Sequence, residues 1–205
     1  LEARLIHQVG GTITVKSSDD GLNAKDWTLE SSDEQGPGQQ TKKVKSEAAN
    51  AKNLEQAGDV KIVIDGGTLT VDAEGDGLDA NGSIEINGGT VVVNGPTSGA
   101  NAALDYDDNA TLNGGTVLFV DNGEMTMGFG SDSSQAFLMA SVQGTAGTTV
   151  EVVDSSGKTV ASLKASKSFS TVLISSPDIK DGEKYTIKVG SNSTTATASK
   201  QAANI

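Results

Sequence analysis

The sequence predicts an all-β protein of stacked repeats, a parallel β-helix, and three observations support this fold class. Gly-Gly-Thr recurs along the chain, and each copy opens a run of β-forming residues. From Gly66 to Gly88 is 22 residues and from Gly88 to Gly114 is 26, which is a period typical of repeat architectures. Aromatic residues make up only 3% of the chain, which suits short strands with an aliphatic core. The four copies begin at Gly10, Gly66, Gly88 and Gly114.

Each repeat is expected to contain three short extended segments. An alternating run comes first, Asp-Gly-Gly or Asn-Gly-Gly forms a tight turn, and a second strand leads to a third segment such as 77–80. A leucine-rich repeat has a similar length, but its Leu/Asn ladder is missing here. Residues one period apart should then lie about 4.8 Å apart on neighbouring parallel strands. The alternating runs are 60–65, 83–87 and 110–113.

Three domains follow from this pattern, with one insertion. Residues 1–134 are expected to form the parallel β-helix, and 25–58 is an insert with a polar loop and a helix-like stretch. The insert is interpreted as a surface decoration or as a lid that contacts ligand. Residues 135–190 carry alternating runs that predict an antiparallel β cap over the solenoid's open end, and 191–205 reads as a tail. These runs lie near 136–142, 148–153, 158–163, 170–175 and 184–189.

Charge and composition limit the partners of the protein. The net charge is −12, which argues against nucleic acid and anionic membranes and favours cations. There is no cysteine, and no run approaches the roughly 20 apolar residues of a membrane span. The first repeat begins almost at once after Leu1, so we expect a fragment or processed form of a longer protein.

Acidic and amide residues recur in step with the repeat. Counted from the first glycine of each pair, position +10 is Asp20, Asp76 and Ser98, and position +13 is Asn23, Asp79 and Asn101. Two carboxylates 4–5 Å apart repel by roughly 3–4 kcal/mol at an effective dielectric of 20, so a stack of them needs water or a cation. Hard oxygen ligands without His or Cys favour Ca²⁺. The predicted metal ligands are Asp19, Asp20, Asn23, Asp76, Asp79, Asn101, Asp105 and Asp107.

The same residues have a plainer explanation. Asp-Gly pairs form turns, and columns of Asn can stack by amide hydrogen bonds without a metal. A nonapeptide calcium roll does not fit, because the period is 22 and its Gly-Gly-x-Gly-x-Asp string is absent. Calcium and turn chemistry therefore both remain open from spacing alone.

Several strings across the chain resemble a bacterial family of carbohydrate-binding β-helix proteins, of the cellulose- and pectin-binding type of cellulolytic clostridia. The resemblance implies a right-handed parallel β-helix like that of polysaccharide lyases, bound Ca²⁺, and affinity for plant cell-wall glycans. The segment after the first Asp-Asp-Gly motif departs from the family, in which it is Gly-rich. The matching strings are Ser17–Ala24, Asp72–Gly82, Val93–Thr97, Ala103–Tyr106, Ala146–Thr149 and Val172–Asp178.

Three functions are compatible with these features. The preferred one is an extracellular or cell-surface, non-catalytic protein that binds polysaccharide, either an acidic glycan such as polygalacturonate through Ca²⁺, or cellulose. Trp27 and Tyr106 are the aromatic candidates for sugar contact, and each is equally readable as a packing anchor. The alternative is a structural adhesion or filament subunit that associates end to end.

A pectate-lyase-like enzyme is the third and least favoured function. Such an enzyme needs a base beside the metal, and Lys16 or Lys25 could serve, although surface lysines are commonly solvated. The one arginine, Arg4, and the one histidine, His7, stand near the N-terminus, away from the acidic motifs in sequence. We therefore expect no catalytic residues.

Overall fold

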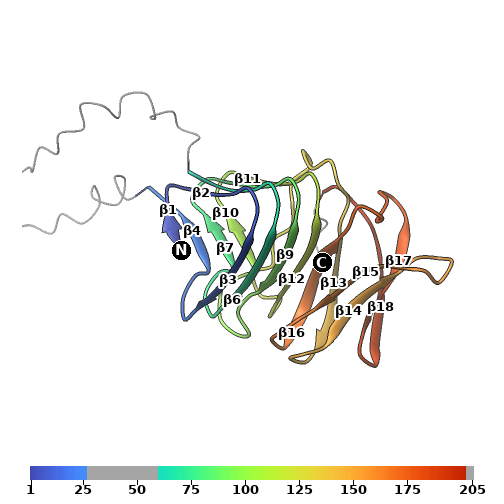
Figure 1. Cartoon of the computed structure of the whole chain (residues 1–205). Helices are drawn as coiled ribbons and strands as arrows, with labels where there is room; N and C mark the ends of the chain where they lie inside the picture. Colours follow the sequence, from blue (N-terminus) through green and yellow to red (C-terminus); the bar gives the residue numbers. More distant parts are fainter. Residues whose placement is uncertain (27–59, 202–205) are drawn as a thin grey trace, which may run out of the picture.

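The computed structural model describes residues 1–26 and 60–201, and it confirms the all-β class (Figure 1). None of these residues forms a helix, so the described part of the chain offers no helix that could cross a membrane. The strands before residue 122 are β1 (Glu2–Ala3), β2 (Leu5–Gln8), β3 (Thr12–Ser17), β4 (Leu22–Ala24), β5 (Lys61–Ile64), β6 (Thr68–Ala73), β7 (Leu78–Ala80), β8 (Ser83–Ile86), β9 (Thr90–Asn94), β10 (Leu104–Tyr106), β11 (Asn109–Leu112) and β12 (Thr116–Asp121). Those after it are β13 (Leu138–Gly144), β14 (Thr149–Val153), β15 (Thr159–Lys164), β16 (Phe169–Ser175), β17 (Lys184–Val189) and β18 (Asn192–Thr197).

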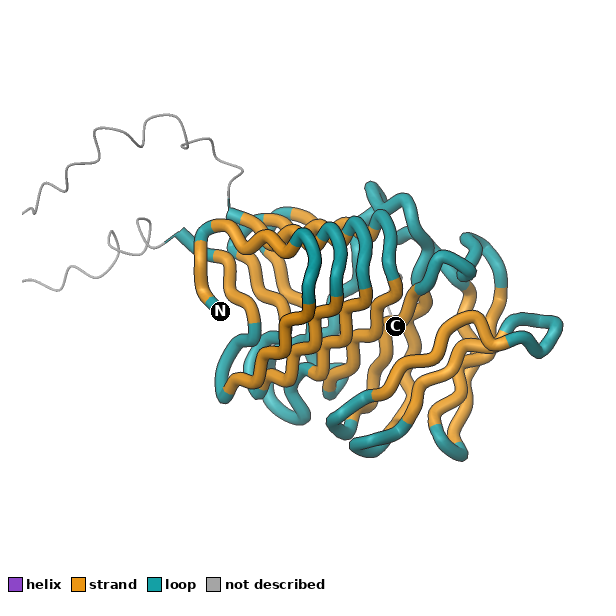
Figure 2. Tube along the Cα trace, in the orientation of Figure 1, coloured by secondary structure: helices purple, strands orange, loops and turns teal. Residues whose placement is uncertain are grey.

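Strands one repeat apart pair in parallel and in register. β2, β5, β8 and β11 form one sheet, and β1, β4, β7 and β10 form a second. β3, β6, β9 and β12 are neighbours in a third sheet, in which Leu69 pairs with Val91 and Val91 with Val117. Figure 2 shows these strands as successive layers along the molecule. The predicted pairing of equivalent residues is confirmed for these strands.

Alternation along the strands explains why the three sheets bury one face each. β5, β6 and β8 alternate between half-buried and buried positions, and their buried side chains meet in one aliphatic core. The predicted turns have the expected backbone, because the second glycine of a pair adopts positive φ, for example 82° at Gly67 and 84° at Gly89. Toward β12 the core ends in aromatic rings, with Phe129 5.8 Å from Phe119 and 5.5 Å from Phe137 between centroids.

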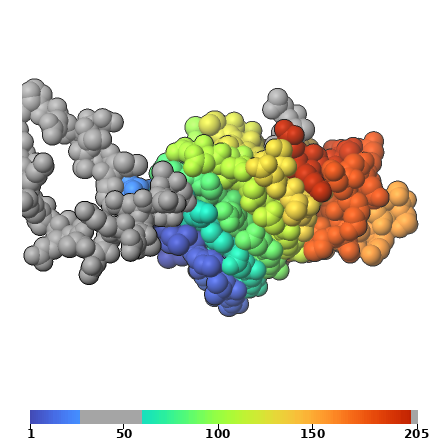
Figure 3. Space-filling model, turned by 90° about the horizontal axis from the view of Figure 1, so that it is seen from above, coloured from blue at the N-terminus to red at the C-terminus, as the bar shows by residue number. Residues whose placement is uncertain are grey.

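The C-terminal strands extend the third sheet and add a fourth. β16 pairs antiparallel with β12, and β13 pairs antiparallel with β16, so the third sheet is mixed and has the order β13-β16-β12-β9-β6-β3. The fourth sheet is antiparallel, with the order β15-β14-β17-β18. A second apolar core contains residues of both sheets, among them Leu118, Ile174 and Ile187. Figure 3 shows the chain proceeding from one end of the molecule to the other, with the last strands opposite the first.

The prediction of a right-handed parallel β-helix, a single solenoid closed by an antiparallel β cap, is wrong. The described residues form four separate sheets, of which two are parallel, one is mixed and one is antiparallel. The regular repeat ends with β12. Of the strands expected to cover an open end, β16 pairs with the edge of β12 and β13 pairs with β16, while β14, β15 and β17 lie in the fourth sheet. The physical reason is that β16 is buried along almost its whole length, with the apolar run Val172–Ile174, and can continue a sheet between two cores.

The predicted division into 1–134, 135–190 and 191–205 stays a prediction, although two observations bear on its parts. The segment read as a tail contains β18, whose Thr195 and Ala196 pair with Thr186 and Tyr185 of β17. Threonine is β-branched and suits such an edge strand. The Ser/Thr-rich composition of the segment had indicated a tail rather than a strand. The predicted insert 25–58 lies outside the described residues, apart from Lys25 and Asp26.

One loop ties the C-terminal strands to the repeats. The Lys167 ammonium lies 3.1 Å from the Asp72 carboxylate and 3.0 Å from that of Glu74, and it donates to the Ala73 carbonyl at 2.6 Å. The buried Asn94 side chain accepts from the Ser166 amide at 2.7 Å. The β15–β16 loop is therefore bound to the ends of β6 and β9.

Replacing Gly77 by alanine should destabilise the protein by about 1–3 kcal/mol, because no room exists for a methyl group. A Cβ there would lie 2.1 Å from Val93 Cγ1 and 2.5 Å from the Ala103 carbonyl oxygen. Gly10→Ala is the matched control, since a Cβ added at Gly10 would have nothing within 4 Å, and its effect should stay within about 0.5 kcal/mol. Urea unfolding followed by circular dichroism measures both, and equal midpoints would contradict this tight layer packing.

Candidate functional site

A row of oxygen-bearing side chains crosses the sheet formed by β1, β4, β7 and β10. Glu2 pairs in register with Asn23, Asn23 with Asp79, and Asp79 with Asp105, and we call these four residues the acidic row. Leu22, Leu78 and Leu104, which precede Asn23, Asp79 and Asp105 in their strands, are buried in the core. Because successive side chains of a strand point to opposite faces, the acidic row lies on the face turned away from the core. Equivalent positions of neighbouring strands lie about 4.8 Å apart.

The register corrects one part of the predicted column. Asp79 was aligned with Asn101 by counting from the glycine pair, but its partner is Asp105. The third repeat is 26 residues long, and its extra residues fall before β10, so Asn101 lies in the preceding loop. The row is therefore more acidic than the sequence count predicted.

The carboxylates of Asp20 and Asp76 lie in the turns before β4 and β7, where they bind backbone. Asp20 Oδ1 accepts from the Asp76 amide at 2.9 Å, and Asp76 Oδ1 accepts from the Ala102 amide at 2.6 Å. Each thus satisfies a backbone amide of the following layer. Asp20 Oδ2 also accepts from Asn23 Nδ2 at 2.9 Å.

Asp121 in the last layer also binds backbone, but of the preceding layer, and sequence reasoning missed it. Its Oδ2 accepts from the Ala103 amide at 3.1 Å, and its Oδ1 accepts from Thr126 Oγ1 at 2.7 Å. It stands 7 residues after Gly114, whereas Asp20 stands 10 after Gly10, so counting by repeats could not find it. Glu2 was missed as well, because a two-residue strand shows no periodicity.

Crowding of carboxylates changes the acidity of the site. Burial, followed by the charges of Asp20, Asp76, Asp105 and Asp107, raises the pKa of Asp79 to about 7. Burial also raises the pKa of Asp76, helped by Asp105, Asp20 and Asp19, although the Ala102 hydrogen bond acts in the opposite direction. Both shifts mean that negative charge on this face is held at a cost in free energy that a cation would relieve.

Asn23 contributes the least satisfied atom of the row. Its side chain is only 7% exposed, and its Oδ1 has no hydrogen-bond partner, while its Nδ2 is used by Asp20. A buried acceptor without a partner is costly, by about 1–3 kcal/mol. An amide oxygen is also a hard ligand of the kind that Ca²⁺ takes. The chemistry of the donors therefore fits calcium.

The geometry of the row is open rather than cage-like. Among residues 1–26 and 60–201, no three His, Cys, Asp or Glu side chains are grouped so that they could hold a metal ion between them. Of the other predicted ligands, Asp19 is exposed, and Asp107 Oδ2 accepts from Asn81 Nδ2 at 3.2 Å. The protein thus presents oxygen donors along a line on one face.

The remaining predicted site residues have identifiable surroundings, with one exception. Tyr106 is half-buried on β10 and donates through its hydroxyl to the Gly128 carbonyl at 2.8 Å, which fits the packing interpretation. Trp27 lies outside the described residues. Of the bases considered for an enzyme, Lys16 is exposed, whereas Lys25 is partly buried and its Nζ lies 3.9 Å from Glu2 Oε1.

The two other basic residues considered in the sequence pair with acids away from the row. His7 Nε2 lies 2.7 Å from Asp65 Oδ2, and Arg4 Nε lies 3.7 Å from Asp26 Oδ2. Asp65 begins a second polar column, in which Asn87 Nδ2 donates to Asp65 Oδ1 at 2.8 Å and Asn113 Nδ2 donates to Asn87 Oδ1 at 3.0 Å. In this column the stacked side chains are joined to one another by hydrogen bonds.

In metal-free buffer, stability should fall as the pH rises from about 4 toward 7, with Asp79 responsible. The folded pKa of Asp79 is about 7 and the ordinary value is 3.8, so the native state binds more protons in this interval. Stability decreases with pH wherever the native state holds the extra proton. Asp79→Asn should flatten the decrease and raise the melting temperature at pH 7–8 by a few degrees, while Asp181→Asn in an exposed turn should leave the slope unchanged. Identical profiles of stability against pH for wild type and Asp79→Asn would contradict the raised pKa of Asp79.

Comparison with known proteins identifies the family. No curated protein and no solved structure matches the chain. A family model described as "Carbohydrate-binding domain-containing protein" matches residues 37–204, which is most of the chain, and covers β7, β10 and all C-terminal strands. The resemblance to a carbohydrate-binding family is thereby confirmed, and the chain belongs to the family of carbohydrate-binding domain-containing proteins.

Proposed function

We propose that this protein is a non-catalytic polysaccharide-binding protein whose acidic row takes up Ca²⁺ and, through it, an acidic glycan such as polygalacturonate. Family membership supports carbohydrate binding. The observation that carries the calcium part is the Asp79 carboxylate, half-buried between Asn23 and Asp105 with a pKa raised to about 7. On this proposal the protein works secreted or at a bacterial cell surface, where calcium and polysaccharide occur together.

The open geometry of the row favours a shared metal site. Asp79 and Asp105 supply oxygens from one side, and Ca²⁺ ordinarily takes 6–8 oxygen ligands. Carboxylates of a uronate chain are oxygen ligands of the same kind and complete the set from the other side. Bound calcium supplies positive charge that lets two anionic surfaces approach each other.

The charge of the protein makes such bridging necessary for an acidic glycan. The chain carries a net charge of −12, so a polyuronate is repelled at long range at low ionic strength. A neutral glycan such as cellulose avoids this repulsion and does not need the row. The row therefore selects for acidic polysaccharide in the presence of calcium.

Calcium and glycan should reinforce each other's binding. With excess EGTA the melting temperature is expected to be lowest, to rise on adding Ca²⁺ but not Mg²⁺, and to rise further with oligogalacturonate, since ligands of the folded state add stability by mass action. Asp79→Asn and Asp76→Asn should lose the calcium response, and Asp181→Asn should keep it. A calcium response that survives both Asp79→Asn and Asp76→Asn would place the ion elsewhere.

Affinity for oligogalacturonate should depend on both calcium and the row. Isothermal titration is expected to show binding with Ca²⁺, none with EGTA, and at least about a tenfold loss in Asp79→Asn, which corresponds to about 1.4 kcal/mol. Equal binding in EGTA would overturn the bridging proposal.

Self-association is a second candidate for the same protein. The outermost strands β1, β2 and β3 lie at one end of their sheets, and Leu5 and Val9 near them are 53% and 72% exposed. Apolar groups on an unpaired sheet edge favour contact with another chain. Light scattering of the glycan-free sample tests this, and a monomer at every concentration and calcium level would reject it.

A further inference from the structure

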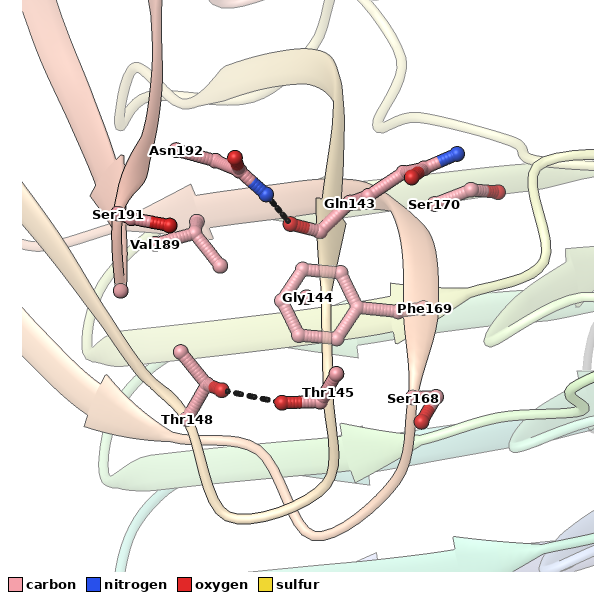
Figure 4. Close-up of a pocket in the computed structure, with 11 residues that line it drawn as sticks. Gln143, Gly144, Thr145, Thr148, Ser168, Phe169, Ser170, Val189, Ser191 and Asn192 are labelled. Carbon is pink, nitrogen blue, oxygen red and sulfur yellow. Dashed lines mark hydrogen bonds between the residues drawn. The ribbon is translucent and has the colours of Figure 1, made fainter.

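A concave site lies apart from the acidic row, where the mixed sheet meets the fourth sheet. It has a volume of about 410 Å³ and is formed by the end of β13, the turn before β14, the start of β16 and the β17–β18 turn (Figure 4). We call it the C-terminal pocket. Its lining residues are Gln143, Gly144, Thr145, Thr148, Ser168, Phe169, Ser170, Val189, Gly190, Ser191 and Asn192.

The lining of the C-terminal pocket is polar and uncharged. Hydroxyl and amide side chains come from all four chain segments, and no Asp, Glu, Lys, Arg or His is among them. The protein has a net charge of −12, so an uncharged pocket of this size is a distinctive part of its surface. Hydroxyls and amides both donate and accept hydrogen bonds, and such groups match a ligand rich in hydroxyls.

The apolar floor of the pocket is Phe169, which packs against Gly144. A Cβ at Gly144 would lie 2.3 Å from Phe169 Cζ and 2.8 Å from Val189 Cγ1, so only glycine admits the ring there. The pairing of β13 with β16 shifts register between Ser141 and Gly144, as a β-bulge does, and this opens the sheet edge beside the ring. Apolar floors with a few polar groups are typical of small-ligand sites.

Two hydrogen bonds lie at the rim of the pocket, one between two chain segments and one within a turn. Asn192 Nδ2 donates to the Gln143 carbonyl at 2.8 Å, and the hydroxyls of Thr145 and Thr148 lie 3.1 Å apart (Figure 4). These bonds connect the β17–β18 turn to β13 and close the turn between β13 and β14.

Other polar groups of the pocket are available to a ligand. In the described part of the chain, the side chains of Gln143, Ser168 and Ser191 form no hydrogen bond with protein, and all three residues are exposed. A rigid rim with unengaged donors and acceptors is what a sugar site requires, because the ordering cost of binding is low.

We infer that the C-terminal pocket binds one neutral sugar residue of a polysaccharide, independently of calcium. Its hydroxyls and amides suit the hydroxyls of an uncharged pyranose, and its apolar floor suits the C–H groups of the same ring. A uronate carboxylate would meet no cation among the lining residues. The inference rests on the proposed carbohydrate-binding function, but it assigns neutral glycan to a different surface from the acidic row.

Titration with soluble neutral oligosaccharides in EGTA tests the inference. Cello-, xylo- and manno-oligosaccharides serve as probes, and at least one is expected to bind and to shift the amide resonances of Gly144, Ser168 and Gly190. Ser191→Trp fills the pocket and should weaken that binding by at least about tenfold. Ser162→Trp on β15, an exposed position outside the lining, is the matched control and should bind normally.

A second pocket variant and a variant of the acidic row distinguish the possible outcomes. The double variant Gln143→Ala, Ser168→Ala removes two unengaged polar groups without adding bulk, and it should also reduce the binding of neutral sugar. It keeps the inference testable even where Ser191→Trp folds poorly. Asp79→Asn should leave neutral binding intact. No binding of any probe in EGTA, or binding unchanged in both pocket variants, overturns the pocket. A protein that binds a neutral probe but does not bind oligogalacturonate in the presence of calcium overturns the acidic-row proposal and supports the pocket.

Discussion

In-register pairing of strands one repeat apart is the constraint on which the rest of this structure depends. It places Leu69 beside Val91 and Val91 beside Val117, which builds a continuous apolar core from short strands. The same pairing stacks the outward residues, whatever their charge. The register that buries the apolar residues therefore also aligns carboxylates on the outer face, and the row containing Asp79 and Asp105 is a direct consequence.

The two polar columns show how such stacking is resolved in different ways. Asp65, Asn87 and Asn113 form a chain of donors and acceptors, so each oxygen in contact meets an amide hydrogen. Asp79 and Asp105 are both acceptors when ionised and cannot pair in this way, and burial, followed by the charges of Asp20, Asp76, Asp105 and Asp107, raises the pKa of Asp79. The difference between amide and carboxylate at equivalent positions separates a structural column from a candidate binding row.

The C-terminal strands give the molecule a surface that the repeats cannot provide. Parallel layers produce lines of equivalent residues, whereas the C-terminal pocket combines unlike residues from several turns around Phe169 and Gly144. A line of acidic donors and an uncharged hollow differ in the glycans that they can accept. Carbohydrate binding by this family is consistent with either surface. Because the acidic row is charged and the C-terminal pocket is not, the two surfaces can be tested separately with acidic and neutral glycans.

The sequence alone determined the all-β class, the turns and most strands, because alternation and Gly-Gly pairs act over a few residues. It also determined that Asn23 and Asp79 would be neighbours, since the first two units have matching spacing between turn and strand. Tertiary structure decided that Asp105 and not Asn101 continues the row, because an insertion before β10 loops out so that Leu104 stays in the core. It also decided that β16 joins β12 rather than capping the stack, because this pairing joins strands distant in the sequence and places Leu173 in one core and Ile174 in the other.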